Sequence, residues 1–164
     1  MELFTYQLNK GGPSKCPYSV STFPFQTNKI MGTRSRIGVQ LADKSILSVY
    51  CHYDGYPEFN GVKLQEHFNS YDAATELIDG GDISCLWTNS GFLNGEIRPE
   101  VGPLYYSSRG EDCPPRIDAN LGKYLANGEE YAYLFANGKW VCYDTKDWSE
   151  TYLQQVEIPA AVCA

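Results

Sequence analysis

Two short segments with regular alternation constrain the fold of this chain more than any other feature. Residues 33–41 (TRSRIGVQL) and residues 46–54 (ILSVYCHYD) carry apolar side chains mainly at odd positions and polar side chains mainly at even positions. A period of two is typical of strands that bury one face. The residues between them, 42–45 (ADKS), favour a turn. We therefore expect a β-hairpin over residues 33–54.

The numbering of the apolar residues limits the register of this hairpin. Because they lie at odd positions in both strands, they share one face only if the connecting loop has three or five residues. Four polar side chains then line the other face: Arg34, Arg36, His52 and Asp54. In one such register Arg36 lies opposite His52, and in the other Arg34 lies opposite His52. Cys51 belongs to the apolar face in both.

A second hairpin is predicted near the C-terminus. Residues 131–144 (YAYLFANGKWVCYD) alternate around Asn137-Gly138, the kind of dipeptide that most strongly favours a two-residue hairpin turn. Such a turn pairs Phe135 with Trp140. Cross-strand aromatic pairs stabilise a sheet by about 0.2–1 kcal/mol each.

Helical patterns fill the interval between the two hairpins. Residues 62–68 favour one helix. A second helix begins near Ser70, which can cap it, and ends at Gly80-Gly81. Three apolar residues form the inward stripe of this second helix: Ala74, Leu77 and Ile78. Residues 83–87 are expected to form a short strand or simply part of the core.

The order of these elements predicts an α+β fold. We expect an antiparallel sheet built from two hairpins, with helices packed on one face. The opposite face is then expected to expose the polar row of the first hairpin, together with some of the 13 tyrosines of the chain.

Other regions lack such patterns. We interpret residues 1–30 either as an irregular N-terminal extension or as a mis-called leader, with translation beginning at Met31. Residues 31–164 are then a single α+β domain. Within it, the density of Gly, Pro, Asn and Ser predicts a loop-rich insertion near residues 88–122. A final amphipathic stretch, residues 148–156, predicts a closing helix.

The composition limits the classes of function. The net charge of −7 argues against binding to a nucleic-acid backbone, which needs a basic surface. No apolar run reaches the roughly 20 residues that span a bilayer, so we expect no membrane partner. The six cysteines include no CxxC pair, and the chain opens without a signal-peptide pattern. We therefore expect mostly free thiols in a reducing cytoplasm, with a disulfide framework as the alternative.

Six residues of the first hairpin and the turn after it form the candidate binding site: Arg34, Arg36, Tyr50, His52, Asp54 and Tyr56. Guanidinium groups make planar contacts with phosphate or carboxylate, and tyrosine rings offer stacking surfaces. One interpretation is therefore a pocket for a small phosphorylated ligand. The other is structural, with Asp54 capping the Gly-Tyr-Pro turn and pairing with Arg34 across the sheet.

No catalytic or metal-binding residue is assigned, and no cofactor is expected. His52 lacks the paired nucleophile and base that a catalytic site needs, since Cys51 lies on the other strand face. His67 resembles half of a zinc-binding helix motif, but position 71 is tyrosine instead of the second histidine. Four acidic residues are interpreted as solvated charges: Glu111, Asp112, Glu129 and Glu130.

Four segments carry a resemblance to known proteins: MGTRSRIG at 31–38, SVYCHYDGYP at 48–57, LQEHFN at 64–69 and IDGGDIS at 78–84. They resemble a group of small phage and prophage proteins that begin with the TRSRIG segment. The resemblance implies a phage accessory protein that acts in the cytoplasm of an infected bacterium. It favours Met31 as the start of the domain, and it carries no catalytic residue to this chain.

These observations together predict a non-catalytic phage accessory protein that binds a host protein or a small phosphorylated ligand. The alternative is an enzyme that acts on nucleotides or phosphate esters. In that case His52 would act as acid and base, and Arg34 and Arg36 would hold the phosphate.

Overall fold

The structure, a computed structural model, describes residues 32–88, 92–93, 96–97, 101–146 and 154–160. They belong to one compact unit, Met31–Ala164. In chain order its elements are β1 (Ser35–Gln40), β2 (Ile46–Tyr53), the π-helix η1 (Pro57–Gly61), α1 (Val62–His67), α2 (Tyr71–Asp79), β3 (Ile83–Thr88), β4 (Phe92–Leu93), β5 (Glu96–Ile97), β6 (Gly102–Tyr105), the 3-10 helix η2 (Tyr106–Arg109), β7 (Arg116–Asp118), α3 (Leu121–Leu125), β8 (Tyr131–Ala136), β9 (Lys139–Asp144) and β10 (Gln155–Val156).

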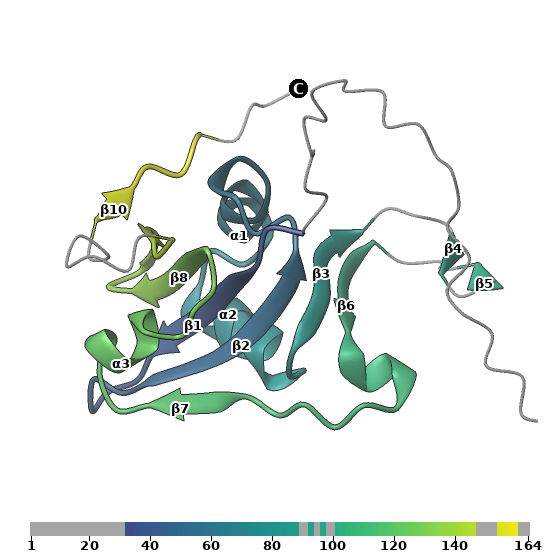
Figure 1. The fold of residues 1–164 in the computed structure, drawn as a ribbon, viewed down its shortest axis with the longest axis horizontal. Helices are drawn as coiled ribbons and strands as arrows, with labels where there is room; N and C mark the ends of the chain where they lie inside the picture. Colours follow the sequence, from purple (N-terminus) through teal and green to yellow (C-terminus); the bar gives the residue numbers. More distant parts are fainter. Residues whose placement is uncertain (1–31, 89–91, 94–95, 98–100, 147–153, 161–164) are drawn as a thin grey trace, which may run out of the picture. The chain divides into compact units, whose positions relative to one another are not determined.

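The main sheet is mixed, which corrects the predicted antiparallel architecture. Its strands lie in the order β10-β9-β8-β1-β2-β3-β6, and β7 pairs with the first part of β2 (Figure 1). β1 runs parallel to β8, and β2 runs parallel to β3. The two hairpins thus join edge to edge through β1 and β8. Helices α1 and α2 lie in the connection between β2 and β3, as a parallel pair requires. β4 and β5 form a separate two-stranded sheet.

The register of β1 and β2 confirms the parity argument. Gln40 lies opposite Ile46, so the connecting loop is the five residues 41–45. The odd-numbered apolar side chains of both strands therefore share one face, as predicted. Continuing the same register beyond β1 places Arg34 opposite His52.

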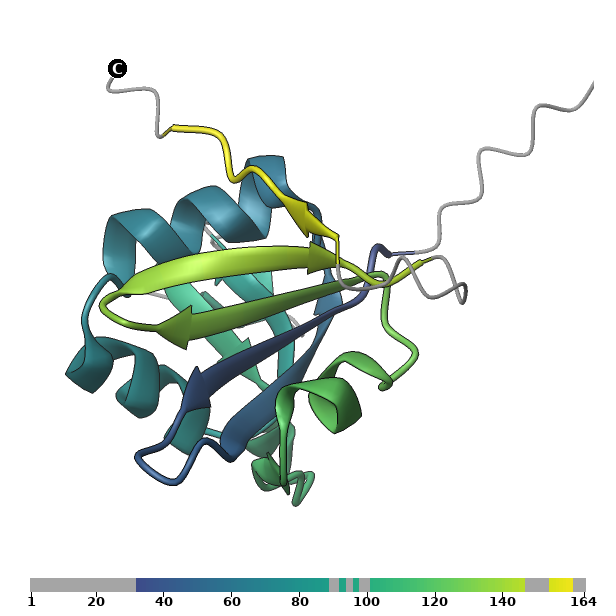
Figure 2. The same ribbon diagram turned by 90° about the vertical axis from the view of Figure 1, so that its left-hand side faces the viewer.

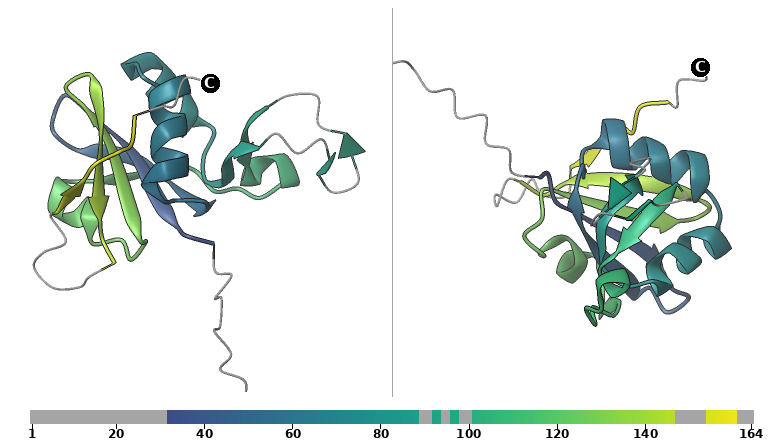
Figure 3. Two further views of the ribbon diagram at one scale, coloured as in Figure 1. Left: turned by 90° about the horizontal axis from the view of Figure 1, so that it is seen from above. Right: turned by 90° about the vertical axis from the view of Figure 1, so that its right-hand side faces the viewer.

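Helices cover both faces of the sheet, so the prediction that they lie on one face is wrong. Helices α1 and α2 pack on the face that carries Ile37 and Val49. Helix α3 packs on the other face, where Tyr124 and Leu125 join Ile46 in a second buried cluster. The two groups of helices lie on opposite sides of the strands (Figure 2), and the view from above shows the same arrangement (Figure 3). Ile46 is the even-numbered apolar residue that departs from the alternation, and it marks where this second core lies.

Tyr124 anchors α3 to the sheet. Its side chain is fully buried, and its hydroxyl lies 3.0 Å from the carbonyl oxygen of Arg36 and 2.6 Å from that of Tyr133. Burial raises the pKa of Tyr124 well above its ordinary value, so the hydroxyl stays protonated and donates to these carbonyl groups. Helix α3 is therefore fixed over the part of β1 that contains Arg36.

Local signals predicted several elements correctly. The cross-strand pairs of β8 and β9 are those predicted, and the turn residues Asn137 and Gly138 have φ angles of 52° and 77°. These positive values are those of the type I′ turn that the dipeptide favours. The Ser70 hydroxyl caps α2 by accepting from the backbone N–H of Ala73 at 3.1 Å. The three residues of the predicted inward stripe are buried: Ala74, Leu77 and Ile78.

The segment predicted as a loop-rich insertion contributes strands to the sheet. β6 pairs with β3, and β7 pairs with β2. These strands are short, and Gly and Pro lie at the start of β6 and Pro directly before β7, so their alternation is too brief to indicate them. Gln155–Val156 forms β10, paired with β9, where a helix was predicted. The rest of that prediction, residues 147–153, and the predictions for residues 1–30 lie outside the described residues.

Two general features concern the described part of the chain alone. Free thiols occur in it at Cys51, Cys113 and Cys142. No helix among the residues described is both long and apolar enough to cross a membrane.

Candidate functional site

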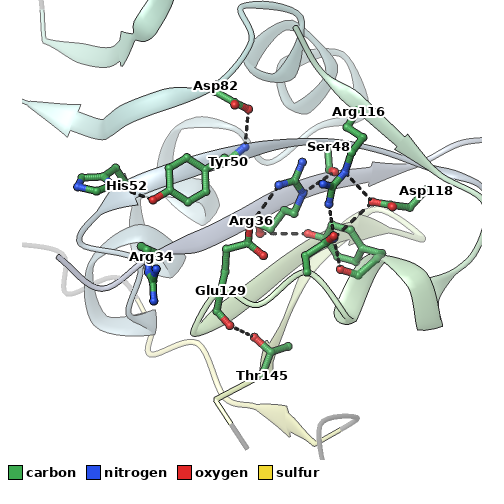
Figure 4. Close-up of polar contacts among 12 residues, drawn as sticks. Arg34, Arg36, Ser48, Tyr50, His52, Asp82, Arg116, Asp118, Glu129 and Thr145 are labelled. Atoms are coloured by element: carbon green, nitrogen blue, oxygen red, sulfur yellow. Dashed lines mark hydrogen bonds and ion pairs between the residues drawn. The ribbon is translucent and has the colours of Figure 1, made fainter. Parts of the chain in front are cut away.

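Arg36 is buried, although the sequence predicts it on an exposed face. Its Nε donates to Ser48 Oγ at 3.1 Å, and a terminal nitrogen donates to Glu129 Oε1 at 3.2 Å (Figure 4). The side chains of Arg36 and Glu129 are only 7% and 11% exposed. The backbone carbonyl of Glu129 also accepts from Thr145 Oγ1 at 2.6 Å. The Arg36 guanidinium therefore lies in a closed network instead of an open phosphate site.

Arg34 makes a second ion pair beside the first. Its backbone N–H donates to Glu130 Oε2 at 2.8 Å. Its guanidinium donates to both carboxylate oxygens of Glu130, each at 3.2 Å. Burial alone would raise the pKa of Glu130, but the hydrogen bonds from Arg34 outweigh it and lower that pKa. The hydrogen bond to Glu130 in turn raises the pKa of Arg34.

The interpretation of Glu129 and Glu130 as solvated charges is therefore wrong. In the parallel register of β1 and β8, Ser35 lies opposite Tyr131. Glu129 and Glu130, the two residues before β8, therefore lie next to the start of β1. Each carboxylate neutralises one arginine. No local pattern indicates this contact, because it depends on a parallel pairing between segments far apart in the sequence.

Four ring side chains gather near the end of β2, and we call them the tyrosine–histidine cluster: Tyr50, His52 and Tyr53 from β2 and Tyr106 from η2. The Tyr50 hydroxyl lies 2.7 Å from His52 Nδ1. The Tyr53 ring packs edge-on against His52, with 4.4 Å between the ring centroids. Tyr106 makes a small contribution to the raised pKa of Tyr50, and Tyr53 makes a small contribution to the raised pKa of Tyr106. The cluster thus combines a hydrogen-bonded pair with aromatic surface.

The raised pKa of Tyr50 keeps its hydroxyl protonated beside His52. Burial, with a smaller contribution from Tyr106, raises the pKa of Tyr50 to about 12. At neutral pH the hydroxyl is therefore protonated and hydrogen-bonded to His52 Nδ1, and it donates to this nitrogen when a neutral His52 carries its proton on Nε2. The backbone N–H of Tyr50 donates to Asp82 Oδ1 at 2.8 Å, which ties β2 to the residue before β3 (Figure 4).

Cationic groups border the tyrosine–histidine cluster but are themselves paired. The guanidinium carbon of Arg109 lies 4.5 Å from the centroid of the Tyr106 ring, a cation–π contact. The same guanidinium lies 3.1 Å from Glu111 Oε1. Further along the same sheet, Arg116 of β7 lies opposite Ser48 and is 3.7 Å from the carboxylate of Asp118.

The two remaining predicted site residues leave the strand. β2 ends at Tyr53, and Asp54 has a left-handed φ of 57°. Strand alternation therefore does not extend to Asp54, and its carboxylate makes no ion pair with any described residue. The prediction that it pairs with Arg34 is wrong. Tyr56 packs against Phe59, with 6.2 Å between ring centroids.

Sequence reasoning assigned Tyr53 to the apolar face and placed Tyr106 in an insertion. No strand alternation indicated Tyr106, because it begins the 3-10 helix η2 directly after β6. Its neighbour Tyr105 packs against the core and donates its hydroxyl to the carbonyl oxygen of Leu77 at 2.9 Å. Tyr53 is 46% exposed because it is the last residue of β2.

Other residues with catalytic potential have structural roles. Cys51 is fully buried on the opposite sheet face, and burial raises the pKa of its thiol to about 12. His67 stacks on Trp87 with 3.8 Å between ring centroids. Among the described residues, no group of three or more His, Cys, Asp and Glu side chains is placed to hold a metal ion.

Comparisons with models of protein families, with curated proteins and with solved structures found no match to this chain. The resemblance to phage and prophage proteins therefore stays a prediction, and the interpretation of function rests on the geometry of the site.

Proposed function

We propose that this protein is a non-catalytic phage accessory protein that binds a host protein through the tyrosine–histidine cluster in the cytoplasm of an infected bacterium. The observation that carries the proposal is the presence of Tyr50, His52, Tyr53 and Tyr106 at one site, with Arg109 stacked beside them. Tyrosine and arginine are enriched among the residues that dominate binding energy at protein interfaces. Tyrosine also supplies large contact area at a low cost in side-chain entropy.

The geometry favours binding of a protein at this face over binding of a phosphate. Both arginines predicted to hold the phosphate are engaged by carboxylates, Arg34 by Glu130 and Arg36 by Glu129. An incoming phosphate would have to displace a carboxylate that already makes charge-assisted hydrogen bonds. A protein surface needs no such displacement, because it can pack on the exposed Tyr53 ring and on the partly exposed rings beside it.

The same contacts support binding over catalysis. The Nδ1 atom of His52 is occupied by Tyr50, and the nearest thiol in sequence, Cys51, is protonated and buried on the other face. In the alternative of an enzyme that acts on phosphate esters, Arg34 and Arg36 would stabilise the developing charge, but both are engaged by carboxylates.

Two tyrosines of matched exposure give the test. Tyr53 in the tyrosine–histidine cluster is 46% exposed, and Tyr71 at the start of α2 is 49% exposed. Host proteins that purify with the tagged full chain should be identified by quantitative mass spectrometry, and the affinity of the best candidate should then be measured by calorimetry with both purified proteins. We expect Tyr53→Ala to weaken this affinity at least tenfold and Tyr71→Ala to leave it unchanged. Equal affinities for wild type and Tyr53→Ala would refute the proposal.

A further inference from the structure

A groove lies next to the N-terminal end of β2. The tyrosine–histidine cluster lies near the C-terminal end of the same strand. Three connections of the chain meet at the groove: the β1–β2 loop, the junction between α1 and α2, and the β8–β9 turn. The groove has a volume of about 420 Å³. Small-molecule sites usually have volumes of roughly 300–1,000 Å³. The space is therefore large enough for a small ligand of about mononucleotide size.

The lining combines an apolar floor with polar groups from separate parts of the chain. Leu41 and Phe135 supply apolar surface, and the amide side chains come from Gln40, Asn69 and Asn137. Amides both donate and accept hydrogen bonds, so they suit a ligand whose body has many polar atoms. Tyr71, which is half exposed, adds a ring on which a flat group can stack.

Lys44 gives the groove its charge. Six other lysine and arginine side chains among the described residues have a carboxylate partner within 4.0 Å. Lys44 has none in the described part of the chain. The acid next to it, Asp43, instead accepts from the backbone N–H and the hydroxyl of Ser45, at 3.0 Å and 2.5 Å. Lys139, which follows the lining residue Gly138, also has no carboxylate partner among the residues described.

The backbone conformation of Lys44 also supports a ligand site at the groove. Its φ angle is 69°, in the left-handed region that glycine and asparagine occupy at least cost. A lysine at this position gives up conformational stability and places an unpaired ammonium group at the groove. Strained residues of this kind occur preferentially at ligand sites.

We propose that this groove binds a small phosphorylated molecule of about the size of a mononucleotide, with the phosphate at Lys44. A lysine ammonium binds phosphate as a point charge, whereas planar recognition of carboxylate favours arginine. The amide groups and the Tyr71 ring then contact the rest of the ligand. This site is separate from the tyrosine–histidine cluster. A negative result at the groove therefore does not refute the host-protein proposal, and a negative result at the cluster does not refute the groove proposal.

Titration of the isotope-labelled full chain, followed by two-dimensional NMR, tests the proposal. The probes are inorganic phosphate, a hexose phosphate, the four ribonucleoside monophosphates, the matching nucleosides, and succinate as a carboxylate. We expect at least one phosphorylated probe to shift the backbone signals of Lys44, Ser70 and Asn137. Its affinity should exceed that of its unphosphorylated form and that of succinate at least tenfold. If no phosphorylated probe shifts these signals, or if succinate binds as tightly, the proposal is wrong.

Two substitutions of Lys44 separate ligand binding from folding. Lys44→Gly removes the ammonium group and also relieves the left-handed strain, so this variant should fold with a urea midpoint at least as high as wild type. Both Lys44→Gly and Lys44→Gln should lower the affinity for the best phosphorylated probe at least tenfold. Lys123→Gln on α3 and Tyr53→Ala are the matched controls and should bind as wild type does. Unchanged affinity in Lys44→Gly would overturn the assignment of the phosphate to this residue.

Discussion

Arg34 and Glu130 are 96 residues apart in the sequence and are joined by three hydrogen bonds, one from the Arg34 backbone and two from its guanidinium. The contact closes the space between the start of β1 and the start of β8. It replaces the ion pair between Arg34 and Asp54 that the hairpin alone predicts. The start of the first hairpin is therefore held by the second hairpin.

Replacing Glu130 should reveal this contact through the pH dependence of stability. The pKa of Glu130 is lowered in the folded state, so its contribution is present above the ordinary value of 4.5 and is lost as the pH falls through the folded-state value. We expect Glu130→Gln to lose about 1 kcal/mol near neutral pH, since Arg34 is partly exposed and screened. The loss should be smaller at an acidic pH below 4.5 than at neutral pH, as measured by urea unfolding. Glu111→Gln, which removes an exposed pair, serves as the control and should change little at either pH.

Removing Glu129 should cost more, because its partner Arg36 is buried. An arginine left without its carboxylate in the interior destabilises a protein by about 3–5 kcal/mol. We expect Glu129→Ala to lower the free energy of unfolding by about 3 kcal/mol. The double variant Arg36→Met, Glu129→Leu should recover most of this loss, because it leaves no unpaired charge. A loss below about 0.5 kcal/mol in Glu129→Ala would contradict the buried pair.

Local patterns in the sequence predicted the elements that depend on neighbours in the chain. Alternation indicated β1 and β2 and determined the parity of their register. Asn137-Gly138 determined the turn of the second hairpin, and Ser70 and Gly80 marked the ends of α2. In each case the signal and the structure lie within one element or one turn, where steric and hydrogen-bond preferences act directly.

The candidate site could not be predicted as completely, because its contacts are long-range. The parallel pairing of β1 with β8 brings Glu129 and Glu130 to the arginines, and it leaves no trace in the alternation of either strand. The burial of Arg36 depends on α3, a five-residue helix that begins at the end of the segment predicted as a loop-rich insertion. Only the even-numbered Ile46, an apolar residue on the polar side of its strand, hinted that this face is covered.

Replacing the glycine of the β8–β9 turn should change the stability of the protein in a direction that the backbone geometry predicts. Gly138 has a φ of 77°, and a Cβ atom there would meet nothing within 4 Å, so the cost of alanine is purely conformational. We expect Gly138→Ala to destabilise the protein by about 1–2 kcal/mol. Gly122→Ala is the matched control, because this glycine lies inside α3 and its Cβ would make only an ordinary contact at 3.4 Å. It should stabilise by up to about 1 kcal/mol. Equal effects of the two substitutions, measured by thermal unfolding, would contradict this assignment of the turn.

The hydrogen bond between Tyr50 and His52 makes a prediction about the imidazole itself. Burial raises the pKa of Tyr50 to about 12, so its hydroxyl stays protonated beside His52 Nδ1 throughout the neutral range. We expect this hydroxyl to donate to Nδ1 and so to hold the neutral ring with its proton on Nε2. Nitrogen-15 NMR of the wild-type ring should therefore show a single tautomer. Tyr50→Phe removes the donor and should give a mixture of the two tautomers. Tyr56→Phe, outside the tyrosine–histidine cluster, should keep the wild-type spectrum. If Tyr50→Phe also keeps a single Nε2–H tautomer, then Tyr50 does not orient His52, and the edge-on contact with Tyr53 is the stronger constraint on the ring.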